Sequence, residues 1–392
     1  MIKTQISSIL DNDFYKITMQ NAVVKLFPSQ IVKYEFINRG KHSFPEGFDQ
    51  ALKDIINKMA ELKLSKEEKK YLAKTCPYLD LPYLDFLEGY HYDPSEVKIT
   101  QTGNDLSVIV EGLWYRTILW EVPLLSLISE LHYEINHMER DTNETVLSKT
   151  LEKANSLNEL EVTFAEFGTR RRHSYKVQNL VVEALTQNKN STFIGSSNIH
   201  FAMKYGVKPI GTHAHEWFMF HAAEYGFKMA NKMALEHWVD VYRGDLGVAL
   251  SDTYTTDVFF QQFDKKFAKL FDGVRHDSGD PLEFADKTIA HYEKNGINPL
   301  FKYIIFSDGL NLEKVEEITE YCKGKIGVSF GIGTNLTNDV GLKPMNIVMK
   351  LIGVQATNKE WIATVKLSDE KGKHTGDPKM IELAKEFLRI KD

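Results

Sequence analysis

Cysteine is almost absent from this chain of 392 residues, which contains only Cys76 and Cys322. Two thiols are too few for a disulfide framework or for a cysteine-rich zinc site. Such sparing use of cysteine is typical of the reducing cytoplasm, so we expect a cytoplasmic protein. No apolar run approaches the length of a membrane span, and residues 1–20 lack the apolar core of a signal peptide. We therefore expect no membrane partner.

A long basic run is also missing, and the formal net charge is -6. Proteins that bind nucleic acid usually present clustered lysines and arginines, so we expect no nucleic-acid partner. Attraction of a polyanionic substrate would have to come from a few local arginines, from helix N-termini and from a bound cation. The hydrophobic content of 43% and charged content of 26% are ordinary for a globular protein, and the length predicts more than one domain.

The first 140 residues combine helices with strands of an antiparallel sheet. Asp13 can cap a helix over residues 14–26. Thr102-Gly103-Asn104-Asp105 is a strong hairpin turn signal between two strands. Further strands are expected at residues 31–38 and 113–119, and further helices at 48–63 and 122–137. This pattern predicts a mixed α+β unit.

From about residue 155 apolar strands alternate with helices. Strands are expected at residues 161–167, 192–194, 207–210, 248–251, 273–275, 303–306, 326–330 and 347–352. Most of the gaps have helical patterns, the longest at residues 215–241. Eight strands with interleaved helices favour a closed (β/α)8-like barrel, with an open doubly wound sheet as the alternative. We expect an N-terminal α+β domain at 1–140, to which 355–392 return, and a barrel domain at 141–354.

Polar loops follow many of the predicted barrel strands, where barrel enzymes place their chemistry. Glycines allow backbone N–H groups to approach phosphate, arginines bind phosphate or carboxylate, and aspartates can hold Mg²⁺ or ribose hydroxyls. The Gly331-Ile332-Gly333-Thr334 loop follows the seventh strand, a frequent phosphate site in barrels. We predict that these loops form one site.

The stretch Gly211-Thr212-His213-Ala214-His215-Glu216 ends a short strand and opens a long helix. The N-terminus of a helix favours anions, so an imidazole there can carry or face a phosphate. The pair His213 and His215 also has the spacing of a zinc site, which leaves a metal-dependent hydrolase as an alternative. His221 and His237 are interpreted as surface residues of the helix.

Five short motifs, in chain order, resemble those of the bacterial type of nicotinate phosphoribosyltransferase. They are Phe167-Gly168-Thr169-Arg170-Arg171, Gly211-Thr212-His213-Ala214-His215-Glu216, Arg275-His276-Asp277-Ser278-Gly279-Asp280, Ser307-Asp308-Gly309 and Phe330-Gly331-Ile332-Gly333-Thr334. Asp13-Phe14-Tyr15-Lys16 and Trp120-Glu121-Val122-Pro123-Leu124 are also similar to family motifs. The resemblance extends from about residue 11 to about residue 350.

This resemblance implies that nicotinate and 5-phosphoribosyl 1-pyrophosphate give nicotinate mononucleotide and pyrophosphate, coupled to ATP hydrolysis, in NAD biosynthesis or salvage. It implies an irregular α/β barrel with a second domain built from the N-terminal part and a C-terminal segment, and usually a homodimer with sites at the interface. Mg²⁺ would be the cofactor and ATP a co-substrate.

The resemblance also implies roles for single residues. His215 would be phosphorylated by ATP, Thr212 would contact the substrate beside it, and Glu216 would orient His215 or occupy the first helical turn. Tyr15, from the neighbouring subunit, and Phe167 would sandwich the pyridine ring. The other implied positions are Arg170, Arg275, Ser278 and Gly279 at substrate, Asp277 and Asp308 at ribose and Mg²⁺-pyrophosphate, and Gly331, Gly333 and Thr334 at the 5-phosphate.

Three alternatives to this function stay open at the level of sequence. The first is the zinc hydrolase already mentioned. The second is a relative that uses nicotinamide or quinolinate, of which the quinolinate enzymes need no ATP. The third is a barrel with a binding or structural role, which would not need so many polar groups at its strand ends.

Overall fold

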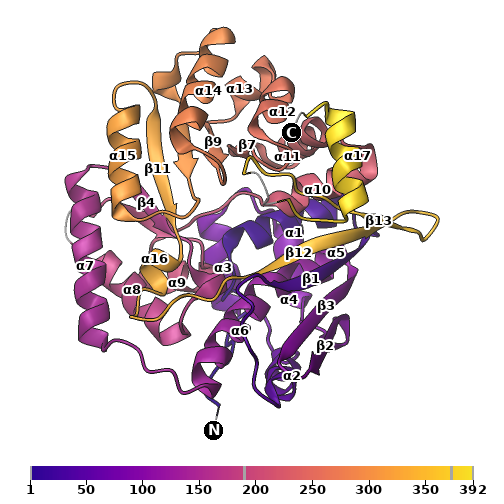
Figure 1. Cartoon of the computed structure of the whole chain (residues 1–392), viewed down its shortest axis with the longest axis vertical. Coiled ribbons are helices and arrows are strands. Elements are labelled where there is room, and N and C mark those ends of the chain that lie inside the picture. The colour runs from indigo at the N-terminus through magenta and orange to yellow at the C-terminus, as the bar shows by residue number, and fades with distance from the viewer. Residues whose placement is uncertain (1, 189–190, 371–373, 391–392) are drawn as a thin grey trace. The chain divides into compact units, whose positions relative to one another are not determined.

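The computed structural model describes residues 2–188, 191–370 and 374–390. By packing, the chain divides into two compact units. Unit 1 comprises Met1–Gly211 and Ile332–Lys350, and unit 2 comprises Thr212–Gly331 and Leu351–Asp392. Figure 1 follows the elements along the chain from indigo to yellow. The sequence domains predicted at 1–140 with 355–392 and at 141–354 stay predictions, because packing into units does not test them.

Unit 1 holds an antiparallel group of strands and a parallel group. Its strands are β1 (Ile31–Asn38), β2 (Val97–Thr102), β3 (Asp105–Leu113), β4 (Thr163–Glu166), β5 (Phe193–Ser196) and β6 (Lys208–Pro209). Strand β3 pairs antiparallel with both β1 and β2, and the expected hairpin is present with Thr102 opposite Asp105. Strands β4, β5 and β6 pair parallel in that order. Residues of β1 alternate between buried and partly exposed, as expected for a sheet with one covered face.

Several helices of unit 1 have side-chain caps, but Asp13, predicted to cap the first one, makes no side-chain cap hydrogen bond there. The helices of this unit are α1 (Phe14–Leu26), α2 (Phe48–Met59), α3 (Lys66–Thr75), α4 (Leu81–Gly89), α5 (Trp114–Thr117), α6 (Glu121–Ile135), α7 (Asn143–Glu159), α8 (Tyr175–Gln187), α9 (Ile199–Tyr205) and α16 (Thr334–Thr337). Asn198 caps α9 through a bond from Phe201 N, and Ser174 caps α8 through a bond from Val177 N. Helices α7 and α8 lie side by side (Figure 1).

Unit 2 contains four strands of the parallel type and most of the remaining helices. Its strands are β7 (Arg243–Leu246), β8 (Val248–Leu250), β9 (Gly273–His276), β10 (Tyr303–Phe306), β11 (Gly327–Ile332) and β13 (Trp361–Ala363). Its helices are α10 (His215–Tyr225), α11 (Ala230–Tyr242), α12 (Thr256–Gln262), α13 (Lys265–Leu270), α14 (Pro281–Lys294), α15 (Leu312–Cys322) and α17 (Pro378–Leu388). Strands β8, β9, β10 and β11 pair parallel in that order, so their carboxyl ends meet at one edge.

The expected α/β class is therefore confirmed, with seven parallel strands among the described residues instead of eight. The predicted eighth strand, residues 347–352, belongs to β12 (Ile347–Gln355), which pairs antiparallel with β13. An apolar run of this length does not distinguish a parallel strand from an antiparallel one, which explains the error.

Two other expectations were wrong for reasons of local chemistry. The strand predicted at residues 113–119 is instead helix α5 followed by a 3-10 turn, because periodicity cannot separate a short, largely buried helix from a strand. The single helix predicted at 215–241 is interrupted at Gly226, whose positive φ of 79° is one that glycine adopts readily, and a separate helix, α11, begins at Ala230. Among the described residues, no helix is long and apolar enough to cross a membrane.

Candidate functional site

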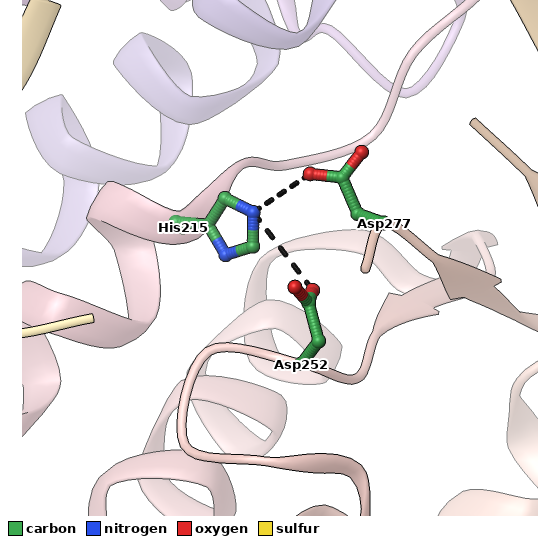
Figure 2. Close-up of side chains that lie close together, drawn as sticks. All are labelled: His215, Asp252 and Asp277. Carbon is green, nitrogen blue, oxygen red and sulfur yellow. Dashed lines mark hydrogen bonds and ion pairs between the residues drawn. The ribbon is translucent and has the colours of Figure 1, made fainter. Parts of the chain in front are cut away.

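His215 is the centre of a buried polar cluster in unit 2. Its Nε2 atom lies 2.8 Å from Asp277 Oδ2 and 3.8 Å from Asp252 Oδ1, and its Nδ1 atom lies 3.0 Å from Thr253 Oγ1. In Figure 2 both carboxylates approach the imidazole from the same side. A fourth group, the Nζ atom of Lys366, lies 2.9 Å from His215 Nε2 and 3.1 Å from Asp252 Oδ2.

The parallel strands of unit 2 bring these groups together. Asp252 follows the end of β8 and Asp277 follows the end of β9, and in the pairing of these strands Leu250 lies opposite Arg275. His215 is the first residue of α10. Thr212 fixes the loop before α10, because its hydroxyl donates to the carbonyl of Val248 in β8 at 3.1 Å. Thr212 therefore has a structural contact beside His215, and its predicted contact with substrate stays a prediction.

The cluster holds its histidine neutral and its carboxylates charged. Burial, and then the neighbouring Lys366 ammonium, lower the pKa of His215 to about 4. Burial alone would raise the pKa of Asp277, but the Arg275 guanidinium, and then the adjacent His215, keep it well below the ordinary value. Lys366 likewise outweighs burial and lowers the pKa of Asp252. At neutral pH the imidazole therefore carries a lone pair, as a nucleophile must.

Arg275 lies in β9, as predicted. Its guanidinium contacts other groups of the protein. It donates to the carbonyl of His213 at 3.3 Å, and its Nη2 atom lies 3.8 Å from Asp277 Oδ2. Arg275 thus stabilises the charge of Asp277. A direct contact with substrate stays a prediction.

Ser278 and Gly279 connect the cluster to a cavity of about 790 Å³ within unit 2. The Ser278 hydroxyl donates to Asp252 Oδ2 at 2.6 Å and accepts from the backbone N–H of Asp369 at 3.1 Å. Gly279 has a φ of 86°, and a Cβ atom there would meet Asp369 Cβ at 3.0 Å. Both residues therefore support Asp252 and the C-terminal segment, and their predicted substrate contacts stay predictions.

The remaining predicted residues of unit 2 lie at the expected strand ends or helix start. Asp308 is partly exposed just after β10, and the neighbouring Ser307 donates to Asp277 Oδ1 at 2.9 Å. Gly331 lies near the end of β11, and Glu216 is buried in the first turn of α10. No described contact tests a catalytic role for Glu216 or Asp308.

A metal ion does not fit directly between His215, Asp252 and Asp277, although one atom of each lies within 4.8 Å of the others. The ammonium of Lys366 already contacts both His215 and Asp252, and a second cation there would be repelled. The carboxylates of Asp277 and Asp308 fit Mg²⁺ better, because the ion prefers oxygen and both side chains are partly exposed, Asp277 by 27%.

The zinc alternative is not supported by the position of His213. Its ring is fully buried against Phe218 and Trp238, with centroid distances of 5.1 and 4.8 Å, and neither ring nitrogen has a hydrogen-bond partner. His213 is also outside the metal-compatible group found among the described residues. His221, expected on the surface, is buried and lies 2.9 Å from His237.

Unit 1 holds the other predicted site residues. The backbone N–H of Phe167 donates to the Ile332 carbonyl at 2.8 Å, and a Cβ atom on Gly333 would lie 3.3 Å from the Phe167 carbonyl. The structure therefore brings the loop after β4 together with the Gly333-Thr334 loop, where Thr334 begins α16. Tyr15 is buried within α1, and Gly211 passes close to its backbone.

Arg170 is the one exposed arginine candidate, with 45% of its side chain accessible. It lies 3.5 Å from Glu121 and 4.0 Å from Asp13. Arg172, two residues later, is instead fully buried and paired with Asp11 and Glu130. The contact of Arg170 with a substrate phosphate stays a prediction.

The sequence placed Asp252 and Thr253 among the polar strand-end loops of the site but assigned neither residue a role, and Lys366 was missed. Asp252 and Thr253 follow a strand, and the rule that located Asp277 applies equally to them. Lys366 stands between the buried residues Val365 and Leu367, so a charged residue inside an apolar stretch was the available signal.

Known proteins of one family resemble this chain. The nicotinate phosphoribosyltransferase (NAPRTase) family matches residues 162–391, and the N-terminal domain of that family matches residues 10–129. A nicotinate phosphoribosyltransferase of Chromohalobacter salexigens is 59% identical over 385 residues, which cover 98% of this chain and 99% of that protein.

Solved structures give the same result. A nicotinate phosphoribosyltransferase from Porphyromonas gingivalis has a TM-score of 0.96 and 46% identity, and the match covers 98% of this chain and 100% of that one. One from Vibrio cholerae has a TM-score of 0.92 and 35% identity, covering 100% and 95%. The chain belongs to the nicotinate phosphoribosyltransferase family.

Proposed function

We propose that the protein joins nicotinate to the ribose of 5-phosphoribosyl 1-pyrophosphate, releases pyrophosphate, and couples this reaction to ATP hydrolysis through a transient phosphate on His215. Family membership supports the transferase reaction. The observation that carries the ATP-coupled part is the neutral, buried His215 between two charged carboxylates and a lysine.

The transfer requires little acid–base chemistry. Positive charge develops at ribose C1 as pyrophosphate leaves, and the pyridine nitrogen of nicotinate is already a sufficient nucleophile. The protein must therefore orient the reactants and exclude water. Tyr15 and Phe167 would hold the pyridine ring, Arg275 would meet nicotinate or the phosphoribosyl group, and Arg170 would reach a phosphate. Gly331, Gly333 and Thr334 would hold the 5-phosphate.

Mg²⁺ would be held by Asp277, Asp308 and substrate oxygens, and it would supply positive charge that stabilises the leaving pyrophosphate. Removal of Mg²⁺ by a chelator should therefore stop transfer. We further expect a homodimer in the cytoplasm, to be checked by light scattering and by fractionation of cells.

Phosphorylation of His215 would couple ATP to this reaction by changing the charge of the site. A phosphoryl group adds up to about two negative charges and strong hydrogen-bond acceptors. These would change the affinity for substrate and product, a coupling free energy between the two reactions. Hydrolysis of the phosphohistidine would complete the cycle.

The decisive experiment is incubation with γ-labelled ATP and Mg²⁺, followed by mass spectrometry. An acid-labile, base-stable label on His215 is expected, and it should be absent in His215→Ala while circular dichroism is unchanged. A label on another residue, or undiminished ATP coupling in the variant, would overturn the ATP-coupled part. Parallel assays with nicotinamide and quinolinate should give little product, and equal rates with either would overturn the choice of nicotinate.

A further inference from the structure

Lys366 reaches the cluster from the C-terminal segment, far from any motif of the sequence. Only 8% of the residue is exposed. Its backbone is held on both sides, since Lys366 and Thr375 exchange two backbone hydrogen bonds of 2.9 and 2.8 Å, and Leu367 N donates to the Thr253 carbonyl at 2.9 Å. Because Thr253 also contacts His215 Nδ1, the segment is fixed directly against the imidazole.

His215 Nε2 has two close neighbours, one of which can only accept a hydrogen bond and one of which can only donate one. Asp277 Oδ2, at 2.8 Å, can only accept a hydrogen bond, whereas the Lys366 ammonium, at 2.9 Å, can only donate one. A neutral ring nitrogen either carries the proton or offers a lone pair. Without Lys366, Asp277 would draw the proton to Nε2 and leave the lone pair on Nδ1, which Thr253 covers.

Negative charge near Nε2 must also be offset if this atom is to receive a phosphoryl group. The carboxylates of Asp277 and Asp252 lie 2.8 and 3.8 Å from Nε2, so a phosphoryl group arriving there would meet two groups of like charge. Arg275 lies nearest Asp277, while Lys366 contacts both Asp252 and the nitrogen itself. Lys366 is thus the cation placed to contact the oxygens of a group bonded to Nε2.

We propose that Lys366 is a catalytic residue of the phosphorylation step, because its ammonium lies between His215 Nε2 and Asp252. In the resting site it donates to the Nε2 lone pair, so that the proton remains on Nδ1 beside Thr253 and the lone pair becomes available to phosphorus when Lys366 turns away. As phosphate is transferred, Lys366 turns to the phosphoryl oxygens. This proposal rests on the proposed function.

The step balances without a further reactant. The bond between the γ-phosphorus of ATP and its bridging oxygen breaks, and its electron pair leaves with ADP. The Nε2 lone pair forms the new nitrogen–phosphorus bond, and the ring proton stays on Nδ1 throughout. No general base is needed.

The test compares Lys366→Met and Lys366→Arg with the control Lys287→Met. Lys287 is a matched control because it also lies in unit 2 and binds two carboxylates, Asp257 and Glu283, each at 2.9 Å. The ¹⁵N NMR signals of His215 report which ring nitrogen carries the proton, and labelling by γ-labelled ATP reports the rate of phosphorylation. Thermal melting and circular dichroism report folding.

In Lys366→Met we expect the His215 proton on Nε2 and a labelling rate lower by about 100-fold, the usual cost of losing one preorganised donor at a developing charge. Lys366→Arg should keep the proton on Nδ1 and recover part of the rate, and Lys287→Met should match the wild type. An unchanged tautomer or an unchanged labelling rate in a folded Lys366→Met would overturn the proposal. Absence of label in the wild type would overturn the proposed ATP coupling, while the tautomer would still test whether Lys366 directs the proton.

Discussion

At the scale of single residues, Glu166 at the end of β4 shows how burial and hydrogen bonding compete. Burial raises the pKa of its carboxyl to about 7, although donors from Ser196, Gln178 and the Gly168 backbone favour the charged form. Glu166 is the last residue of β4 and directly precedes the predicted ring-binding Phe167. Its protonation state therefore affects the stability of the loop that carries Phe167.

Glu166→Gln should change how stability depends on pH. A folded pKa above the unfolded value of 4.5 stabilises the protein fully below pH 4.5, and this contribution is lost as pH rises through about 7. The loss amounts to about 3 kcal/mol in the wild type and is absent in the variant. Urea unfolding measures the free energy of unfolding at pH 5 and pH 8. Relative to the wild type, the variant should be more stable at pH 8 than it is at pH 5. A pH-independent difference between the two proteins would contradict this account.

Asp277 gives a second prediction at this scale, because it orients the imidazole that is proposed to be phosphorylated. Asp277→Asn keeps the size of the side chain but removes the charge that holds His215. We expect kcat to fall on the order of 100-fold or more, as for other groups that orient a reacting histidine. Asp286→Asn on the exposed face of α14 is the matched control and should be unaffected. Equal steady-state rates for both variants would remove Asp277 from the mechanism.

At the scale of elements, close backbone approach decides where glycine is required. Gly195 in β5 has a φ of 154°, and a Cβ atom there would lie 2.0 Å from the Lys208 carbonyl oxygen of β6. Backbone atoms cannot move aside as the end of a long side chain can. The pairing of β5 with β6 therefore depends on this glycine.

Gly195→Ala should destabilise the protein by about 2 kcal/mol or more, because overpacking forces the two strands apart. Gly89→Ala, at the end of α4, is the control, since a Cβ atom there would meet nothing within 4 Å. That change should be neutral or slightly stabilising. Thermal melting of the two variants measures the contrast, and equal melting temperatures would show that the pairing can adjust.

Sequence patterns predicted elements well where the local signals were strong. The hairpin at Thr102–Asp105 and the strand-end positions of Asp277 and Asp308 followed from turn chemistry and from the alternation of strands with helices. Helix α5 was missed because the periodicity of its largely buried segment is ambiguous, and the break at Gly226 was missed because an isolated glycine does not by itself end a helical pattern. Asp252 follows the end of a strand, as Asp277 does, but it lies in none of the recognised sequence motifs.

At the scale of the whole molecule, contacts between distant parts of the chain lay beyond sequence reasoning. Lys366 is 151 residues from His215, and Asp369 accepts from the backbone and hydroxyl of Thr256, 113 residues away. No period or motif connects such positions. Tertiary structure alone brings the C-terminal segment into unit 2, where its lysine completes the cluster.

Two truncated chains test separately the contribution of helix α17 and that of the stretch that contains Lys366 and Asp369. Helix α17 (Pro378–Leu388) buries only Ala384 among its described residues, so a chain that stops after Asp377 should remain folded. It keeps both Lys366 and Asp369. A chain that stops after Thr364 loses both, and with them the cation at His215 and the acceptor for the start of α12.

We expect the chain ending at Asp377 to form the His215 label at a rate close to that of the full chain. The chain ending at Thr364 should label about 100-fold more slowly, because the charge that offsets the incoming phosphoryl group is missing. Amide hydrogen exchange should increase at α12 in the shorter chain and remain unchanged at α7 and α8 of unit 1. If both truncations label equally, the C-terminal segment has no part in the phosphorylation. If exchange increases throughout unit 1 as well, the shorter chain has lost its fold, and the comparison of Lys366→Met with Lys366→Arg decides the question.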